Sequence, residues 1–165
     1  MFTKAQPWIT FLSRLILGGI LIVAGVLKIP HPDKSAMAVR AYELLPVSVA
    51  NIFGFSLPWV EVGVGVLLVL GIAVRINAAI GTFLMFLFVV AISQAWARGL
   101  TIDCGCFGNG GQVAADQTKY LEEILRDLGL GIAGIFAWKF PHGRFGIDSR
   151  NLGAVQISEE DSQER

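Results

Sequence analysis

The chain has 165 residues, of which 54% are hydrophobic and only 16% are charged, and its mean hydropathy is +0.63. Soluble domains usually carry about 25% charged residues, so the composition argues against a soluble globular enzyme, and its high hydrophobicity excludes a disordered chain. Thirteen basic and thirteen acidic residues cancel, so no net positive field attracts nucleic acid. Two cysteines are too few for a disulfide-dense secreted scaffold.

Four apolar stretches predict membrane-spanning helices over about residues 8–29, 50–72, 76–97 and 120–140. The first three are long enough to cross about 30 Å of hydrocarbon as helices. The fourth is apolar only over residues 128–138, and its first turns are charged. Beside three other spans we interpret it as a crossing with a polar entrance. The predicted fold is therefore all-α, a polytopic four-helix bundle in the lipid bilayer formed by residues 1–140.

The connections between these stretches differ in character. In residues 35–45 apolar side chains recur at helical spacing opposite charged ones, which predicts a short amphipathic helix on the membrane surface between the first two spans. A plain connecting loop is the alternative. The third connection, residues 98–119, is polar and glycine-rich and contains both cysteines. Residues 141–165 form a polar tail, and its end is expected to be disordered.

An even number of crossings places both termini on one side of the membrane. The first and third connections, with the surface helix and the cysteine loop, then share the other side. Lysine and arginine residues are equally frequent near the two sides, so charge bias does not indicate which side is cytoplasmic.

The sharpest local signal is the segment Asp103-Cys104-Gly105-Cys106-Phe107-Gly108. Two cysteines separated by one glycine can close a small disulfide ring, for which Gly105 supplies the backbone freedom. Strained, exposed disulfides are the more oxidising ones, so the pair predicts a catalytic thiol–disulfide site. Asp103 disfavours a thiolate at Cys104, which favours Cys106 as the attacking thiol. Two unrelated loop cysteines are the alternative.

We expect no metal site, because two thiolates and His31 would leave a zinc ion short of a ligand. Four charged residues of the predicted spans are expected to be buried: Arg14, Glu61, Arg126 and Asp127. Such groups are costly in a membrane and usually face the bundle interior with a partner. At about 1.5 Å per residue Glu61 is within reach of Arg14, and Arg126 is the other candidate partner. These charges either hold the helices of the bundle together or take part in redox-linked proton transfer or quinone binding.

Glycines recurring in three of the spans predict close helix packing.

In several segments the sequence resembles the DoxX-like membrane proteins, and among them the MauE type. The matching segments are Arg14-Leu15, Ala24-Gly25-Val26-Leu27-Lys28, Tyr42-Glu43-Leu44-Leu45-Pro46, Pro58-Trp59-Val60-Glu61, Cys104-Gly105-Cys106-Phe107-Gly108 and Arg126-Asp127. The resemblance covers about residues 10–140 and implies a four-helix membrane protein whose cysteine loop lies outside the cytoplasm. The MauE type is associated with maturation of a periplasmic, disulfide-rich dehydrogenase subunit. Other DoxX-like proteins are associated with thiol and sulfur oxidation or with membrane oxidoreductase assemblies.

Together these observations predict a thiol–disulfide redox protein of the bacterial plasma membrane with cytoplasmic termini. Cys104 and Cys106 would exchange disulfides with an extracytoplasmic thioredoxin-like or substrate protein, and a quinone in the bundle is a candidate electron acceptor. The alternative is a non-catalytic accessory or assembly subunit of a membrane oxidoreductase or respiratory complex, in which the disulfide is static.

Overall fold

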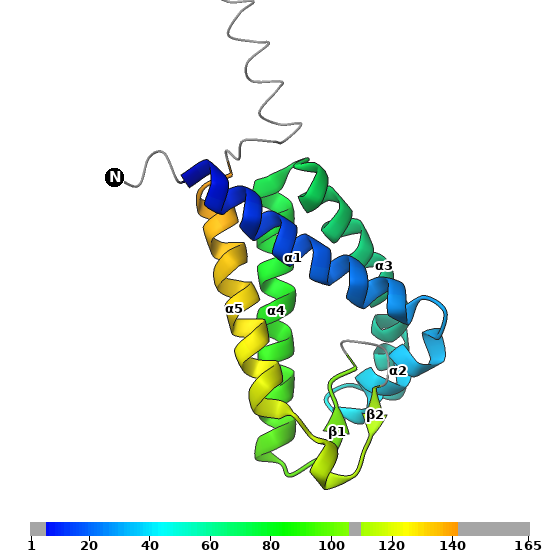
Figure 1. The fold of residues 1–165 in the computed structure, drawn as a ribbon. Helices are drawn as coiled ribbons and strands as arrows, with labels where there is room; N and C mark the ends of the chain where they lie inside the picture. The colour runs from blue at the N-terminus through cyan, green and yellow to red at the C-terminus, as the bar shows by residue number, and fades with distance from the viewer. Residues whose placement is uncertain (1–5, 106–109, 142–165) are drawn as a thin grey trace, which may run out of the picture.

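The computed structural model describes residues 6–105 and 110–141, apart from the side chain of Ala115. Within these residues the chain forms five α-helices and a two-stranded hairpin (Figure 1). The helices are α1 Gln6–Lys28, α2 Pro32–Ala41, α3 Val47–Leu70, α4 Val74–Ala97 and α5 Tyr120–Lys139. The strands β1 Ile102–Asp103 and β2 Gly111–Gln112 pair antiparallel, and a short 3-10 helix, η1 Ala115–Gln117, precedes α5.

Helices α1, α3 and α4 are long and apolar enough to cross a membrane, with mean hydropathies of 2.2, 1.9 and 2.2 over their most apolar windows. Within the described ranges α5 is long enough but not apolar enough to be counted with these three helices, because its first two turns carry four charged side chains. Three of the predicted crossings are therefore found as apolar helices of the required length, and the fourth crossing stays a prediction.

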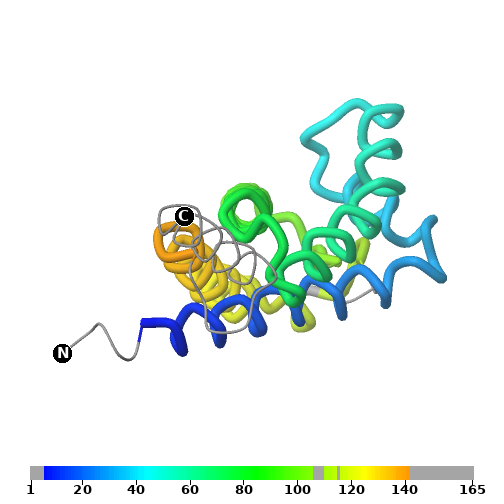
Figure 2. The backbone as a smooth tube through the Cα atoms, turned by 90° about the horizontal axis from the view of Figure 1, so that it is seen from above, coloured from blue at the N-terminus to red at the C-terminus, as the bar shows by residue number. Residues whose placement is uncertain are grey.

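The four long helices pack mainly as two pairs, α1 with α3 and α4 with α5. Helix α1 packs along α3 and against α5, while α4 packs along α5. Figure 1 shows α4 and α5 side by side, with α1 running obliquely across them, and Figure 2 shows α1 along one side of the other three long helices. Helix α1 begins and α5 ends at one end of the bundle, whereas α2 and the hairpin lie together at the opposite end (Figure 1). The described parts of the first and third connections thus share one end of the bundle, while their place on one side of a membrane stays a prediction.

Helices α1 and α3 approach closely where glycines face each other. A Cβ atom added to Gly18 would lie 2.8 Å from the carbonyl oxygen of Gly65, and one added to Gly65 would lie 2.7 Å from that of Gly18. A second contact brings Gly25 against Pro58, whose carbonyl oxygen would be 2.6 Å from an added Cβ. These contacts confirm the packing role predicted for Gly18, Gly25 and Gly65, because small residues let membrane helices approach closely. Gly19, Gly63 and Gly129 do not pack in this way, because an added Cβ at these positions would have no neighbour within 4 Å.

Helix α5 turns a stripe of apolar side chains outward and buries the acidic Asp127. Its exposed large apolar residues recur every three or four positions along the whole helix: Leu121, Leu125, Leu128, Ile132, Ile135 and Trp138. Asp127, in contrast, is only 2% exposed. A helix on the surface of a soluble protein would show the opposite pattern, with its polar face toward water.

The first and third connections contain more structure than the sequence predicted. The third forms a β-hairpin within the expected all-α fold, with Ile102 opposite Gln112 and Asp103 opposite Gly111. In the first, the expected short helix is α2, but it ends at Ala41 and packs against α3 and β2. Its buried side is made of small residues, including Ala36 and Ala38. Whether α2 also lies on a membrane surface stays a prediction.

Candidate functional site

Two tyrosines hold the hairpin that carries the cysteine segment. The hydroxyl of Tyr42, at the end of α2, donates a hydrogen bond to the carbonyl oxygen of Cys104 at 3.2 Å. The hydroxyl of Tyr120, at the start of α5, accepts one from the backbone N–H of Ile102 at 2.9 Å and donates one to the carbonyl oxygen of Leu100. Both tyrosines are buried. The backbone just before the cysteine segment is thereby fixed to two helices that are far apart in sequence.

Gly105 lets the chain turn tightly beneath α2. Its φ of +71° lies in the left-handed region that favours glycine, as expected from its place between the cysteines. A Cβ atom at this position would lie 2.5 Å from the Cβ of Ala38, and Gly110 meets the same alanine. The backbone N–H of Gly105 donates a hydrogen bond to Asp103 Oδ1 at 2.8 Å. The positive φ of Gly105, its close contact with Ala38 and its hydrogen bond to Asp103 therefore together fix the backbone path after Cys104.

Cys106 lies outside the described residues, as do Phe107 and Gly108. The disulfide expected between Cys104 and Cys106 is therefore a prediction that the geometry does not test. Cys104 itself is half-buried and packs beside the apolar cluster formed by α4, β1 and the start of α5.

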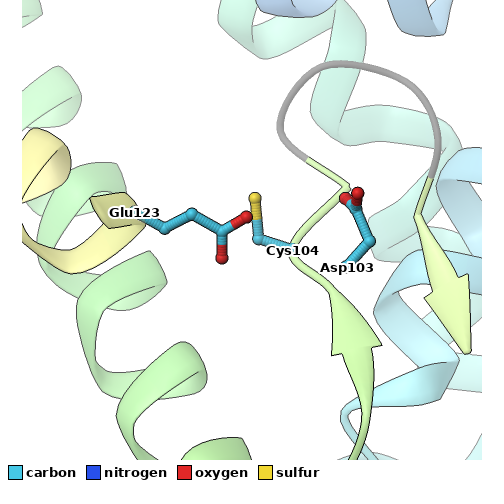
Figure 3. A group of neighbouring side chains, drawn as sticks. All are labelled: Asp103, Cys104 and Glu123. Atoms are coloured by element: carbon cyan, nitrogen blue, oxygen red, sulfur yellow. The ribbon is translucent and has the colours of Figure 1, made fainter. Parts of the chain in front are cut away.

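A second acidic residue, Glu123, lies beside Cys104 in addition to Asp103. The sequence analysis did not identify it as part of the site. Glu123 reaches from the first turn of α5 toward the sulfur atom (Figure 3). The two side chains share a hydrogen bond. The Oε2 atom of Glu123 is buried and has no hydrogen-bond partner among the described residues. Glu123 stands four residues before Asp127, and this helical spacing is the signal that could have identified it.

Asp103, Cys104 and Glu123 bring one ligand atom each to within 4.8 Å of one another. Carboxylate oxygen and thiolate sulfur are both zinc ligands, and three protein ligands suffice for an open zinc site. The trio could thus bind a divalent cation, although Asp103 already accepts a hydrogen bond from Gly105. His31, which the sequence reasoning weighed as a ligand, is exposed at the start of α2 and is not part of this group.

Glu61 pairs with Lys28, which corrects the predicted pairing with Arg14 or Arg126. The Nζ atom of Lys28 lies 2.7 Å and 2.8 Å from the two carboxylate oxygens, and the side chains are 4% and 1% exposed. The reason lies in the contact of Gly25 with Pro58 on α3. Lys28 and Glu61 each follow this contact by three residues, but on helices that run in opposite directions. Because helical side chains tilt toward the N-terminus of their helix, the two long side chains point back toward the contact and meet there.

Arg14 is buried, as predicted, but it stabilises the end of a helix. Its Nε atom donates a hydrogen bond to the carbonyl oxygen of Leu68 at 3.0 Å, and Nη2 donates one to Val69 at 3.4 Å. Helix α3 ends two residues later, so its last carbonyl groups lack partners within the helix. A cation at a helix C-terminus also interacts favourably with the helix dipole. The position of Arg14 is explained by this structural role.

Arg126 and Asp127 form a pair of their own. The Nε atom of Arg126 lies 2.9 Å from Asp127 Oδ1, while Asp127 Oδ2 is buried without a hydrogen-bond partner in the described part of the chain. Both residues line a small internal cavity together with Glu61. Its volume of about 10 Å³ is close to the space that one water molecule needs. The predicted charges thus divide into a capping arginine and two ion pairs, Lys28 with Glu61 and Arg126 with Asp127, whose acidic members both line this cavity.

An apolar groove of about 380 Å³ lies between α4 and α5. It is lined by Ala79, Thr82, Phe83, Phe86, Ile135 and Trp138. These residues belong to the first half of α4 and the last turns of α5, at the end of the bundle opposite the hairpin (Figure 1). The groove offers space for a hydrocarbon chain, but it does not adjoin Cys104.

Comparison with known proteins gives consistent matches. A family model described as "Methylamine utilisation protein MauE" matches residues 6–140. The chain is 37% identical over 145 residues to the methylamine utilization protein MauE of Methylorubrum extorquens, covering 86% of this chain and 75% of that protein. It is 32% identical over 106 residues to the MauE protein of Paracoccus denitrificans (64% and 57% covered) and 32% identical over 102 residues to that of Methylophilus methylotrophus (61% and 54% covered). No solved structure matches the chain.

The buried ion pair predicts a coupled effect on stability. Glu61→Gln should lower the thermal unfolding temperature in detergent, because it leaves Lys28 buried without an anion. Such a loss costs about 3–5 kcal/mol in soluble proteins, and contacts between membrane helices are worth about 1–2 kcal/mol. Adding Lys28→Met should recover part of the loss, whereas Glu122→Gln, in the exposed pair with Lys119, should change little. An unchanged unfolding temperature of Glu61→Gln would contradict the structural role.

The contact between Gly105 and Ala38 predicts a second coupled pair. Gly105→Ala should destabilise the protein more than Gly99→Ala, because both glycines have positive φ but only Gly105 has a neighbour in the way. Ala38→Gly removes that neighbour, so the double variant with Gly105→Ala should lose less stability than the sum of the two single losses. Thermal unfolding of the four proteins in detergent measures this coupling. Equal losses in Gly105→Ala and Gly99→Ala would show that the hairpin does not rest on α2.

Proposed function

The chain belongs to the MauE family, and from this premise we propose that it is a membrane thiol–disulfide redox protein acting in methylamine utilisation. Cys104 and Cys106 are its proposed redox pair. The proposal draws its process from the printed names of the relatives and its chemistry from the cysteine segment. The wider DoxX-like relationship, in which thiol oxidation recurs, is part of the same proposal.

The observation that carries the proposal is the position of Cys104. The backbone on both sides of this residue is fixed by Tyr42 and by Gly105, while its sulfur meets the carboxylate of Glu123. Thiol–disulfide exchange proceeds through the thiolate, and a positioned carboxylate can take up the proton of a thiol. A cysteine with only a packing role would need neither the acidic neighbour nor the tight turn.

We propose that α5 is the fourth crossing. Its charged residues made it appear too polar in composition, but the acidic Asp127 is buried while the apolar stripe from Leu121 to Trp138 faces outward along the whole helix. Helix α5 also packs along α4, which has the length and hydropathy of a span. Charged groups in membrane helices face the bundle interior in this way.

Four crossings would leave both termini on one side of a bacterial plasma membrane. We propose that this side is the cytoplasm, as the family resemblance implies, and that the hairpin and α2 face outward. The partner would then be an extracytoplasmic protein, either thioredoxin-like or a substrate that acquires its disulfides there. The proposed electron acceptor is a quinone, for which the apolar groove between α4 and α5 offers space at the end of the bundle away from Cys104.

A second candidate function is that of a non-catalytic accessory or assembly subunit of a membrane oxidoreductase or respiratory complex. The structural use of the buried charges favours it. Arg14 caps α3, and the ion pair of Lys28 with Glu61 joins α1 to α3. Neither of these arrangements needs a redox reaction to account for it. In this case the cysteine pair would form a static disulfide.

Trapping of a covalent intermediate distinguishes the two functions. Cys104→Ala removes the proposed resolving thiol, so a partner linked through Cys106 should accumulate and appear on a non-reducing gel. The variant that lacks both cysteines should show no such species and should fail to support growth on methylamine in cells that depend on this protein. Unchanged growth and partner oxidation with the double variant would exclude the redox function and favour the accessory subunit.

A further inference from the structure

The apolar groove between α4 and α5 has about the length of one lipid acyl chain. On α4 its lining includes Ala79, Thr82 and Phe86, which follow one another at spacings of three and four and so share one helix face. At about 1.5 Å per residue, Phe86 lies roughly 16 Å along α4 from Arg75 in the first turn. The hydrocarbon core of a bilayer is about 30 Å thick, so a single leaflet supplies roughly half of that depth.

Arg75 lies at the mouth of this groove. It precedes Ala79 by about one helical turn, so both residues are on the same face of α4. Its Cζ atom is 5.9 Å from the centroid of the Trp138 ring, which lines the groove from α5. A cation at this distance over a tryptophan ring is attracted by it. The side chain of Arg75 is therefore held beside the groove, although the residue is exposed.

The exposed charges at this end of the bundle are positive. Arg75 and Lys139 stand at the start of α4 and the end of α5 (Figure 1), and neither forms an ion pair with a described residue. In the described part of the chain, acidic residues are absent from α1 and α4, from α3 after Glu61 and from α5 after Asp127. The N-terminus of α4 adds the positive end of a helix dipole. An anion at the mouth of the groove is thus attracted, and no carboxylate of these segments repels it.

We propose that the groove binds one anionic phospholipid, with an acyl chain between α4 and α5 and the phosphate on Arg75. Basic pockets between membrane helices bind anionic lipid head groups, and the planar guanidinium of an arginine matches a phosphate with two parallel hydrogen bonds. The volume of about 380 Å³ is in the range of binding sites for small molecules. The inference rests on the proposed crossing by α5, which places Trp138 in the membrane, and not on the proposed redox chemistry.

The charges favour this lipid over two other occupants of the same groove. The quinone proposed as electron acceptor is uncharged, so it competes for the apolar part of the groove but gains nothing from Arg75. A second copy of the chain is disfavoured by repulsion. In a membrane dimer with its two-fold axis along the bilayer normal, the same patch of both chains meets, and two positive ends would lie side by side.

Fluorescence of Trp138 reports the occupant directly, because this ring lines the groove. The full-length protein with Trp8→Phe, Trp59→Phe and Trp96→Phe keeps Trp138 as its single tryptophan, and the three replaced rings are exposed. It is placed in phosphatidylcholine vesicles, and lipids with dibrominated acyl chains are added because bromine quenches tryptophan on contact. Brominated phosphatidylglycerol should quench Trp138 at a mole fraction about fivefold lower than brominated phosphatidylcholine, the factor that corresponds to about 1 kcal/mol per basic residue.

Substitutions in the single-tryptophan protein identify the contacts of the head group and of the chain. Arg75→Gln should abolish the preference for phosphatidylglycerol, whereas Arg75→Lys should keep most of it because the positive charge is retained. Ala79→Phe should also abolish the preference, because the larger side chain fills the groove. Lys119→Gln is the matched control, since it removes a positive charge at the hairpin end, where Lys119 pairs with Glu122, and should leave the preference unchanged.

Four results would overturn the inference. Equal quenching by the two brominated lipids, or a preference that survives Arg75→Gln, would show that no head group is bound at Arg75. Reversal of the quenching by ubiquinone at a lower mole fraction than by unbrominated phosphatidylglycerol would identify a quinone site. Quenching that increases as the protein is diluted in the membrane would identify a second copy as the occupant.

The same measurement separates this inference from the proposals on which it does or does not rest. If no brominated lipid quenches Trp138, the end of α5 lies outside the bilayer, and the proposed crossing fails together with the lipid site. Quenching without any preference leaves the crossing in place and removes only the lipid site. Neither result affects the redox function, which is decided by the trapping of a covalent intermediate and by growth on methylamine.

Discussion

The ion pair between Lys28 and Glu61 joins α1 to α3 in the interior of the bundle, with the ammonium nitrogen 2.7 Å from one carboxylate oxygen. Separating two buried charges is costly, so the two helices must cross at this point. The crossing is possible because Gly18, Gly25 and Gly65 allow backbone contact. Since α2 follows α1 directly and precedes α3, the same crossing sets where α2 lies.

The position of α2 in turn decides where the cysteine segment can lie. Ala38 on its buried side leaves room for glycine only at position 105, and Tyr42 at its end binds the backbone of Cys104. From the other side, Tyr120 and Glu123 of α5 meet the hairpin. The redox chemistry proposed for Cys104 thus depends on contacts with two separate helices, α2 and α5, that precede and follow the hairpin in sequence.

Much of the fold followed from the sequence because it depends on local pattern. Apolar stretches of sufficient length predicted α1, α3 and α4, and the cysteine segment was identified by its spacing. Partners were harder to predict, since the depth of a residue along a helix does not give its direction around the helix. Glu61 was therefore assigned to Arg14 or Arg126, although Lys28 lies on the contacting face. Glu123 was missed because nothing local links it to Cys104, and the small hairpin because two-residue strands leave no periodic pattern.

The central claim is that Cys104 and Cys106 form a reversible disulfide on the outer face of the membrane. The most direct test labels intact cells with a membrane-impermeant maleimide before and after a brief pulse of reductant. The account predicts no label before the pulse, labelling of both cysteines after it, and loss of reactivity once the reductant is removed. Cysteines that react only after the cells are opened, or that stay reduced after the pulse, would contradict it.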